Sequence, residues 1–168
     1  MKRMFVVYGK MDSGKSHTMW LLLCHLLEQG ARIIEPMYHV IVPFTYEKIM
    51  TTKDHLPDFR AVVEWKGKEI MLLSAGDYLI HCYWGFKLHI KWAMEQEIDY
   101  VICCSRSQNR EGSIYRELME EYRDSVLLDE DWFRVEKMDK DADWLNERDK
   151  TANEILSKLK LAIDKSNL

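Results

Sequence analysis

The sequence has little of what marks membrane or nucleic-acid-binding proteins. It contains no run of about 18 apolar residues, so we expect no membrane-spanning helix and no membrane partner. Its net charge is −4, which gives no general attraction to nucleic acid, and no nucleic-acid partner is expected. Only 3 prolines and 7 glycines occur, and no Gly/Ser-rich linker or repeat interrupts the chain. Residues 1–168 are therefore expected to form a single domain with a buried core.

One stretch near the start of the chain carries a specific motif. It reads G-x-x-x-x-G-K-[ST] in full and consists of Gly9, Lys10, Met11, Asp12, Ser13, Gly14, Lys15 and Ser16. Residues 3–8 before it form a short apolar run typical of a strand, and residues 15–29 after it have an apolar helix pattern that Gly30 ends. Strand, glycine-containing loop and helix in this order are the context in which the motif binds phosphate.

The chemistry of this motif follows from its backbone. Gly9 and Gly14 let the chain curl and approach a phosphate without an intervening Cβ. The loop amides and the positive end of the next helix then favour an anion. Lys15 would reach the β- and γ-phosphates as a catalytic group, and the Ser16 hydroxyl would ligate Mg²⁺. In these residues the chain resembles the P-loop nucleoside triphosphate hydrolase superfamily, specifically over residues 1–30 and only in architecture beyond them.

The four cysteines carry no metal-site signal. Cys24, Cys82, Cys103 and Cys104 lack paired ligand spacing, and we interpret them as buried free thiols in a reducing compartment. On a strand, Cys103 and Cys104 would point to opposite faces. A cleavable signal at the N-terminus would remove the phosphate-binding motif, so export is not expected and a cytoplasmic location is predicted.

Apolar patterns of strand type and helix type alternate along the chain. Strands are expected at residues 3–8, 33–34, 39–42, 59–65, 68–74, 98–104, 126–128 and 133–135. Helices are expected at 15–29, 79–96, 113–122 and 142–164, with a loop or a short helix at 43–58. A turn at Lys66-Gly67 makes a hairpin of the two strands that flank it. This order predicts a three-layer, doubly wound α/β domain of the P-loop type, whose mostly parallel sheet has one antiparallel hairpin strand.

A P-loop site needs an acidic residue near Mg²⁺, and Asp77 is the candidate. It follows the apolar strand at 68–74, on the edge where such sheets bind ligands. Asp77 would hold the metal together with Ser16 or position a water molecule; alternatively, it caps the helix expected at 79–96. The residue directly after the apolar run is Ser74 instead of Asp, and its hydroxyl is a candidate for binding a metal-bound water.

Two arginines follow the next buried strand. Residues 105–112 are polar and contain Arg106 and Arg110. A guanidinium stays charged and grips phosphate oxygens bidentately, so this segment is interpreted as a lid or an internal arginine finger. Arg106 is the catalytic candidate because it is closer to the strand end. The alternative is a solvated loop whose arginines pair with Glu111 or Glu117.

Other residues of the loop suggest further roles. Lys10 makes the loop similar to that of dimerising ATPases of the MinD/ParA type, in which an early lysine reaches the partner's nucleotide. This resemblance implies a homodimer, but Met11 and Asp12 stand where that family has glycines; the alternative is a solvent-facing lysine. His17 would approach the phosphates or lie partly exposed on the helix. Residues 11–16, which read Met-Asp-Ser-Gly-Lys-Ser, are also similar to the loop of translation-factor GTPases.

The motifs that read guanine are missing. No N-K-x-D string occurs, and the closest one, Glu-Lys-Met-Asp at 136–139, is either a charged surface turn or a site where Lys137 covers a purine and Asp139 binds the guanine edge. The hairpin ends at Leu-Ser-Ala-Gly (73–76) and lacks the Asp of D-x-x-G. These differences favour ATP over GTP.

Three functions follow from these patterns. The first is Mg²⁺-dependent binding of a nucleoside triphosphate by residues 9–17, with hydrolysis or transfer of the γ-phosphate. The second is a kinase for a small molecule or a nucleotide, with residues 43–60 as the acceptor site and 105–112 as a lid. The third is a non-catalytic nucleotide-binding module that presents a Trp-rich surface to a protein partner.

Overall fold

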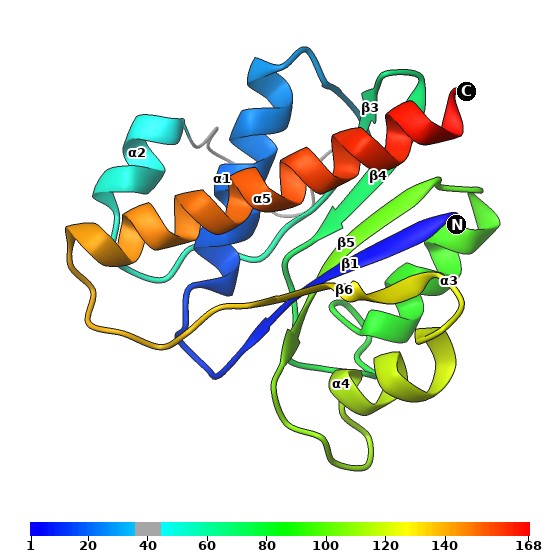
Figure 1. Ribbon diagram of the computed structural model, residues 1–168. Coiled ribbons are helices and arrows are strands. Elements are labelled where there is room, and N and C mark those ends of the chain that lie inside the picture. Colours follow the sequence, from blue (N-terminus) through cyan, green and yellow to red (C-terminus); the bar gives the residue numbers. More distant parts are fainter. Residues whose placement is uncertain (36–44) are drawn as a thin grey trace.

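The computed structural model describes residues 1–35 and 45–168 and has an α/β fold (Figure 1). Its elements are β1 (Arg3–Gly9), α1 (Lys15–Glu28), β2 (Arg32–Glu35), α2 (Tyr46–Thr51), β3 (Arg60–Trp65), β4 (Lys68–Leu73), α3 (Phe86–Glu95), β5 (Tyr100–Arg106), α4 (Ile114–Glu117), η1 (a π-helical turn, Leu118–Tyr122), β6 (Leu127–Arg134) and α5 (Ala142–Ser166). The strand expected at 39–42 lies outside the described residues.

The described strands form one six-stranded sheet in the order β2-β3-β4-β5-β1-β6. The β4–β5, β5–β1 and β1–β6 pairs are parallel, whereas β3 runs antiparallel to both β2 and β4. The prediction of a mostly parallel sheet with one antiparallel hairpin strand is therefore confirmed. The turn of the hairpin consists of Lys66 and Gly67, whose φ angles of 53° and 76° are the left-handed pair that a tight hairpin turn requires.

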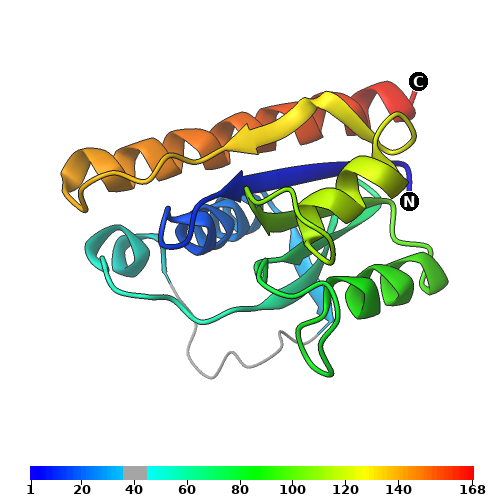
Figure 2. The same cartoon turned by 90° about the horizontal axis from the view of Figure 1, so that it is seen from below.

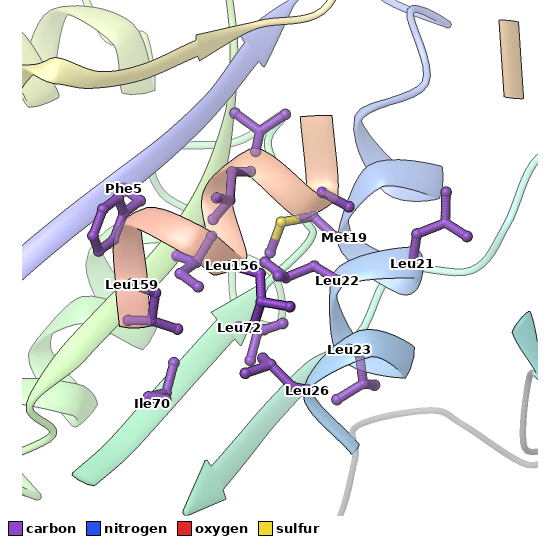
Figure 3. Close-up of a cluster of buried hydrophobic side chains, with 14 of the residues drawn as sticks. Phe5, Met19, Leu21, Leu22, Leu23, Leu26, Ile70, Leu72, Leu156 and Leu159 are labelled. Carbon is purple, nitrogen blue, oxygen red and sulfur yellow. The ribbon is translucent and has the colours of Figure 1, made fainter. Parts of the chain in front are cut away.

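Helices lie on both faces of the sheet (Figures 1 and 2). Alternate residues of β1 point to different cores: Phe5 and Val7 pack under α1 and α5, while Met4 and Val6 pack against α3 and η1. Leucines of α1, the hairpin and α5 meet in the larger core (Figure 3). Since α5 crosses over α1 on this face, the last helix of the chain covers the helix that follows the motif loop.

The adjacent thiols of β5 also separate into the two cores. Cys104 lies in the larger core and Cys103 in the core under α3, as their alternation on a strand predicts. Burial raises the pKa of Cys104 to about 12 and raises that of Cys103 well above its usual value. Cys24 is half-buried and Cys82 is exposed, so the prediction of buried thiols is wrong for Cys82.

The helix expected at 79–96 begins only at Phe86. Gly85 before it is extended, with φ −64° and ψ 129°, and an added Cβ there would lie 2.5 Å from the His81 backbone nitrogen. The preceding turn is held by the His81 ring, whose Nδ1 accepts from the backbone N–H groups of Tyr83 and Trp84. Ile80, which fitted the apolar spacing, is 78% exposed. The prediction of a helix is therefore wrong for residues 79–85, because the contacts of the His81 side chain stabilise a non-helical backbone conformation there.

Other boundaries agree more closely with the patterns. The two short strands expected at 126–128 and 133–135 are joined in β6, whose pairing with β1 is interrupted by a register shift. The Ser113 hydroxyl caps α4 by accepting from the Arg116 N–H at 3.1 Å. Asp141 caps α5 in the same way through the Trp144 N–H at 3.0 Å. This cap fixes where α5 starts, next to the motif loop.

A buried histidine under the sheet makes folding sensitive to acid. His89 Nδ1 accepts from Arg60 Nη1 at 3.2 Å, and its Nε2 donates to the Tyr83 carbonyl at 2.9 Å, so the neutral ring satisfies both groups. Burial, together with the positive charge of Arg60, lowers the pKa of His89 below its usual 6.5. Arg60 is itself held by Glu35 and by the Trp92 ring, 4.0 Å from its guanidinium.

The free energy of unfolding is expected to fall when the pH drops from 7.5 to 5.5. Below pH 6.5, His89 becomes protonated in the unfolded chain but stays neutral in the folded chain. The free energy of unfolding therefore falls by up to about 1.4 kcal/mol per pH unit. Urea unfolding followed by tryptophan fluorescence at both pH values measures this loss. His89→Gln is expected to reduce the difference between the two pH values, and an unchanged difference would contradict this account.

Candidate functional site

The motif loop lies where the carboxyl ends of three neighbouring strands meet. β1 stands between β5 and β6, and Gly9 at its end is paired with Arg106 of β5. On the other side, the Val135 N–H donates to the Tyr8 carbonyl at 2.9 Å, which brings the segment after β6 alongside the loop. The sequence thus folds so that the loop opens on the edge of the sheet where parallel strands bind ligands.

Both motif glycines lie so close to neighbouring atoms that a side chain at either position would clash. A Cβ on Gly9 would lie 2.5 Å from the Val135 carbonyl oxygen. Gly14 has φ +96°, and a Cβ there would lie 2.7 Å from Arg148 Cδ and 2.8 Å from a ring carbon of Trp144. The left-handed conformation of Gly14 follows that of Asp12, φ 58°, and together they curl the loop into the start of α1.

The Lys15 ammonium lies inside this curl. Its Nζ donates to the carbonyl oxygens of Gly9 at 3.1 Å and Lys10 at 2.9 Å. Burial lowers the pKa of Lys15, while the negative charge of Asp77 acts in the opposite direction. A desolvated cation held by neutral carbonyls gains more from an anion than one in water does.

A cavity of about 130 Å³ opens beside the loop. One wall consists of the loop and the first turn of α1, residues 11–17. The remaining walls bring together distant parts of the chain: His55, Leu56, Asp58, Ser74, Gly76, Asp77, Lys140 and Trp144. The predicted residues Ser16 and Asp77 therefore share one cavity, whose lining does not include Gly9 and Lys10.

His17 is buried in the cavity wall. Its Nε2 donates to the Thr52 carbonyl at 2.8 Å, and its ring packs edge-on against Trp144 with 4.7 Å between centroids. Burial lowers its pKa, so the neutral ring is favoured, as at His89. The expectation of a partly exposed helix histidine is wrong, because α2 and α5 cover this face of α1.

Asp77 and Arg106 are brought together as an ion pair. Arg106 Nε donates to Asp77 Oδ1 at 2.9 Å, and the Asp77 side chain is 46% exposed. Asp77 does not cap α3, whose first residue is preceded by Gly85. Arg106 lies in an adjoining hollow with Arg110, at the mouth of the cavity. Glu117, one of the two glutamates expected to pair with these arginines, instead forms an ion pair with Lys87 at 3.5 Å.

Asp58 is a site residue that the sequence analysis missed. It lines the cavity from the loop before β3, and Ser74 Oγ donates to it at 3.4 Å. Burial, and then the negative charge of Asp77, raise the pKa of the Asp58 carboxyl. No motif surrounds Asp58; only the register of the hairpin, which brings it next to Ser74, could have indicated it.

The first turns of α5 support the loop from behind and were also missed. Arg148, 4% exposed, donates through Nη1 to the carbonyls of Ser13 at 2.6 Å and Glu136 at 3.1 Å. Trp144, 1% exposed, contacts Gly14 and lines the cavity. Ser13 Oγ, Trp144 Nε1 and Arg148 Nε are buried without a hydrogen-bond partner among the described residues.

The Glu-Lys-Met-Asp string lies beside the loop but outside the cavity. The Glu136 carbonyl and the Met138 sulfur contact Arg148, whereas Lys137 and Asp139 are exposed and do not line the cavity. Of this segment only Lys140 reaches the cavity, and its Nζ lies 5.7 Å from the centre of the Trp144 ring. The role of Lys137 and Asp139 in binding a base stays a prediction.

Metal and membrane features are few in the part of the chain that the structure describes. No group of three or more His, Cys, Asp or Glu side chains converges there as a metal cage. None of the helices described has the length and apolar content needed to cross a membrane. Metal ligation at this site would thus use single carboxylates and hydroxyls together with ligand oxygens, which is how Mg²⁺ is commonly held.

The arrangement can do the following chemistry. A curled loop, a helix N-terminus and a buried ammonium offer positive charge to an anion, and hydroxyl and carboxylate oxygens next to them suit a hard cation. Comparison of the chain with protein-family models, curated proteins and solved structures finds no match.

Proposed function

We propose that this protein is a Mg²⁺-dependent nucleoside triphosphate-binding protein of the P-loop type that hydrolyses or transfers the γ-phosphate. The observation that carries the proposal is the position of the Lys15 ammonium. It lies in the curl of residues 9–16, between the end of β1 and the start of α1. A cation in such a loop, beside a helix N-terminus, is suited to phosphate oxygens. ATP is favoured over GTP because the guanine-reading string is missing.

Each part of the cavity has a role in this proposal. The amides of the loop and Lys15 bind the phosphate chain, and Lys15 exchanges its two carbonyl acceptors for phosphate oxygens. Ser16 and a cavity carboxylate are oxygen donors of the kind that Mg²⁺ takes, so the residues fit the metal. When bound, Mg²⁺ neutralises charge on the phosphates.

Arg106 supplies further positive charge at the mouth of the cavity. Its partner Asp77 is half exposed, so the ion pair can exchange for a phosphate contact at modest cost. Arg106 would then stabilise the charge that develops during transfer of the γ-phosphate. This is the role expected of an internal arginine finger.

Thermal melting with nucleotides tests the proposal. ATP with Mg²⁺ at about 100 times its dissociation constant is expected to stabilise the fold by about 2.7 kcal/mol and to raise the melting temperature. GTP is expected to give a smaller shift, and adenosine none. No shift with either triphosphate, for protein with an intact cooperative transition, would overturn the proposal.

A kinase is the second candidate, supported by the wall opposite the loop. His55, Leu56 and Asp58 belong to the expected acceptor segment 43–60 and line the same cavity as Lys15. Residues 43–44 of that segment lie outside the described residues. Phosphate release without an acceptor would favour hydrolysis, whereas turnover only in the presence of a nucleoside or metabolite would favour the kinase.

Binding without turnover would favour the non-catalytic module. Trp20, Trp65 and Trp144 are buried, and Trp84, Trp92 and Trp132 are half-buried, so a Trp-rich docking surface has little support.

Lys10 is exposed, as a lysine that reaches a partner's nucleotide in a homodimer would be.

A further inference from the structure

We propose that Asp58 is the carboxylate that holds the Mg²⁺ of the bound nucleotide, in place of the aspartate missing at Ser74. This inference rests on the proposed function, since it concerns the same cavity. It assigns a binding role to a residue that no motif marks and moves that role from Asp77 to the segment just before β3.

Ser74 occupies the end of β4, where an acidic residue is expected. Its Oγ accepts from the Phe59 N–H at 2.7 Å, and its single proton lies within reach of the Phe59 carbonyl at 3.3 Å and of Asp58 Oδ1 at 3.4 Å. Ser74 is 3% exposed, so its hydroxyl is committed to these neighbours. The antiparallel pairing of β3 with β4, which sets Arg60 opposite Leu73, brings Asp58 to the same edge of the sheet. A carboxylate therefore lies beside the end of β4, but it comes from the loop that leads into the adjacent strand.

The two carboxylates that line the cavity, Asp58 and Asp77, differ in their existing partners within the protein. Asp77 is half exposed and is paired with Arg106 at 2.9 Å. Asp58 is less exposed and makes no ion pair with the residues that the structure describes; its hydrogen bond is the one from Ser74. A desolvated carboxylate without a cation is unfavourable unless something positive binds it. Asp58 is thus the carboxylate that gains more from a bound cation.

The other oxygen donors needed for Mg²⁺ lie in the same cavity. Ser16 at the start of α1 lines it together with Asp58, as does Lys15. Mg²⁺ usually keeps several waters and takes one or two carboxylates together with phosphate oxygens. Asp58 and Ser16 provide the protein part of such a set.

The test compares the affinity for ATP in Mg²⁺ and in EDTA, measured by calorimetry. Asp58→Asn is expected to lose about tenfold of the affinity that Mg²⁺ adds. In EDTA it is expected to bind ATP about two- to fivefold more tightly than the wild type, because a negative charge near the phosphates is gone. Opposite changes in the two buffers are what a structural role would not produce. Asp54→Asn, an exposed carboxylate of the same loop, is the matched control and should change neither affinity.

Two further variants make the outcome decisive. Asp77→Asn is expected to keep most of the Mg²⁺ effect, and Asp58→Asn/Ser74→Asp is expected to recover it by placing the carboxylate at the strand end. If Asp58→Asn melts too low for titration, Asp58→Ser removes the same charge and carries the same expectations.

The inference is overturned if Asp58→Asn keeps the wild-type response to Mg²⁺, or loses affinity equally in both buffers. It is also overturned if Asp77→Asn loses the response instead, which would restore Asp77 as the metal ligand. Failure of the wild type to bind ATP in either buffer would overturn the proposed function itself, so the two failures are distinguishable.

Discussion

Lys15→Ala is expected to weaken the binding of Mg²⁺–ATP by about a hundredfold. The ammonium offers charge-assisted hydrogen bonds to phosphate, and losing about 3 kcal/mol of such contacts corresponds to this factor. Without nucleotide, the variant should melt at the wild-type temperature or slightly above, because a desolvated cation has been removed and its acceptors are loop carbonyls. Calorimetry for affinity and thermal melting for stability measure the two effects separately.

Lys160→Ala is the control for Lys15→Ala. Lys160 is exposed on α5, so its loss removes the same formal charge far from the phosphate loop. It should leave both affinity and melting temperature unchanged. Wild-type affinity in Lys15→Ala, with this control behaving as expected, would show that the loop does not bind the phosphates.

Trp144→Ala is expected to lower the free energy of unfolding by about 3–5 kcal/mol, the usual cost of removing a fully buried tryptophan. The ring fills the space between His17 and Gly14, so its loss opens a cavity behind the phosphate loop. The affinity for nucleotide should fall as well, since Trp144 lines the cavity in which we propose that nucleotide binds. Urea unfolding at neutral pH gives the stability, and calorimetry gives the affinity.

Trp144→Phe separates packing from polarity. The indole N–H has no partner among the described residues, so a phenyl ring gives up volume but no hydrogen bond. A loss of about 1 kcal/mol is expected, well below that of the alanine variant. Equal losses for the two variants, or a loss below about 1 kcal/mol for alanine, would contradict the role of Trp144 as the support of the loop.

The parts of the site that the sequence could predict are local ones. Residues 3–29 form a strand, a glycine loop and a helix because near neighbours determine each of them. The alternation of strands and helices, with a tight turn at Lys66-Gly67, predicted the mixed sheet. Asp77 and Arg106 were each placed after a buried strand, although their ion pair was not predicted. In each case the signal lies within a short window of sequence.

The missed residues depend on contacts between distant segments. Asp58 reaches the cavity only because the hairpin folds it next to Ser74. Arg148 lies on the helix that was expected at 142–164 from its apolar pattern. That pattern does not indicate that an arginine is buried or that it binds a distant backbone carbonyl. The helix expected from residue 79 was wrong because its apolar spacing competed with a turn held by His81.

The hydrogen bond between Arg148 and the Ser13 carbonyl joins residues 135 positions apart. On a translating ribosome, the phosphate loop therefore emerges long before the helix that holds it in shape. A ligand stabilises only the folded form that it binds. Nucleotide can thus stabilise the loop only after α5 has docked against it, and occupancy of the loop would report that these two distant segments have come together.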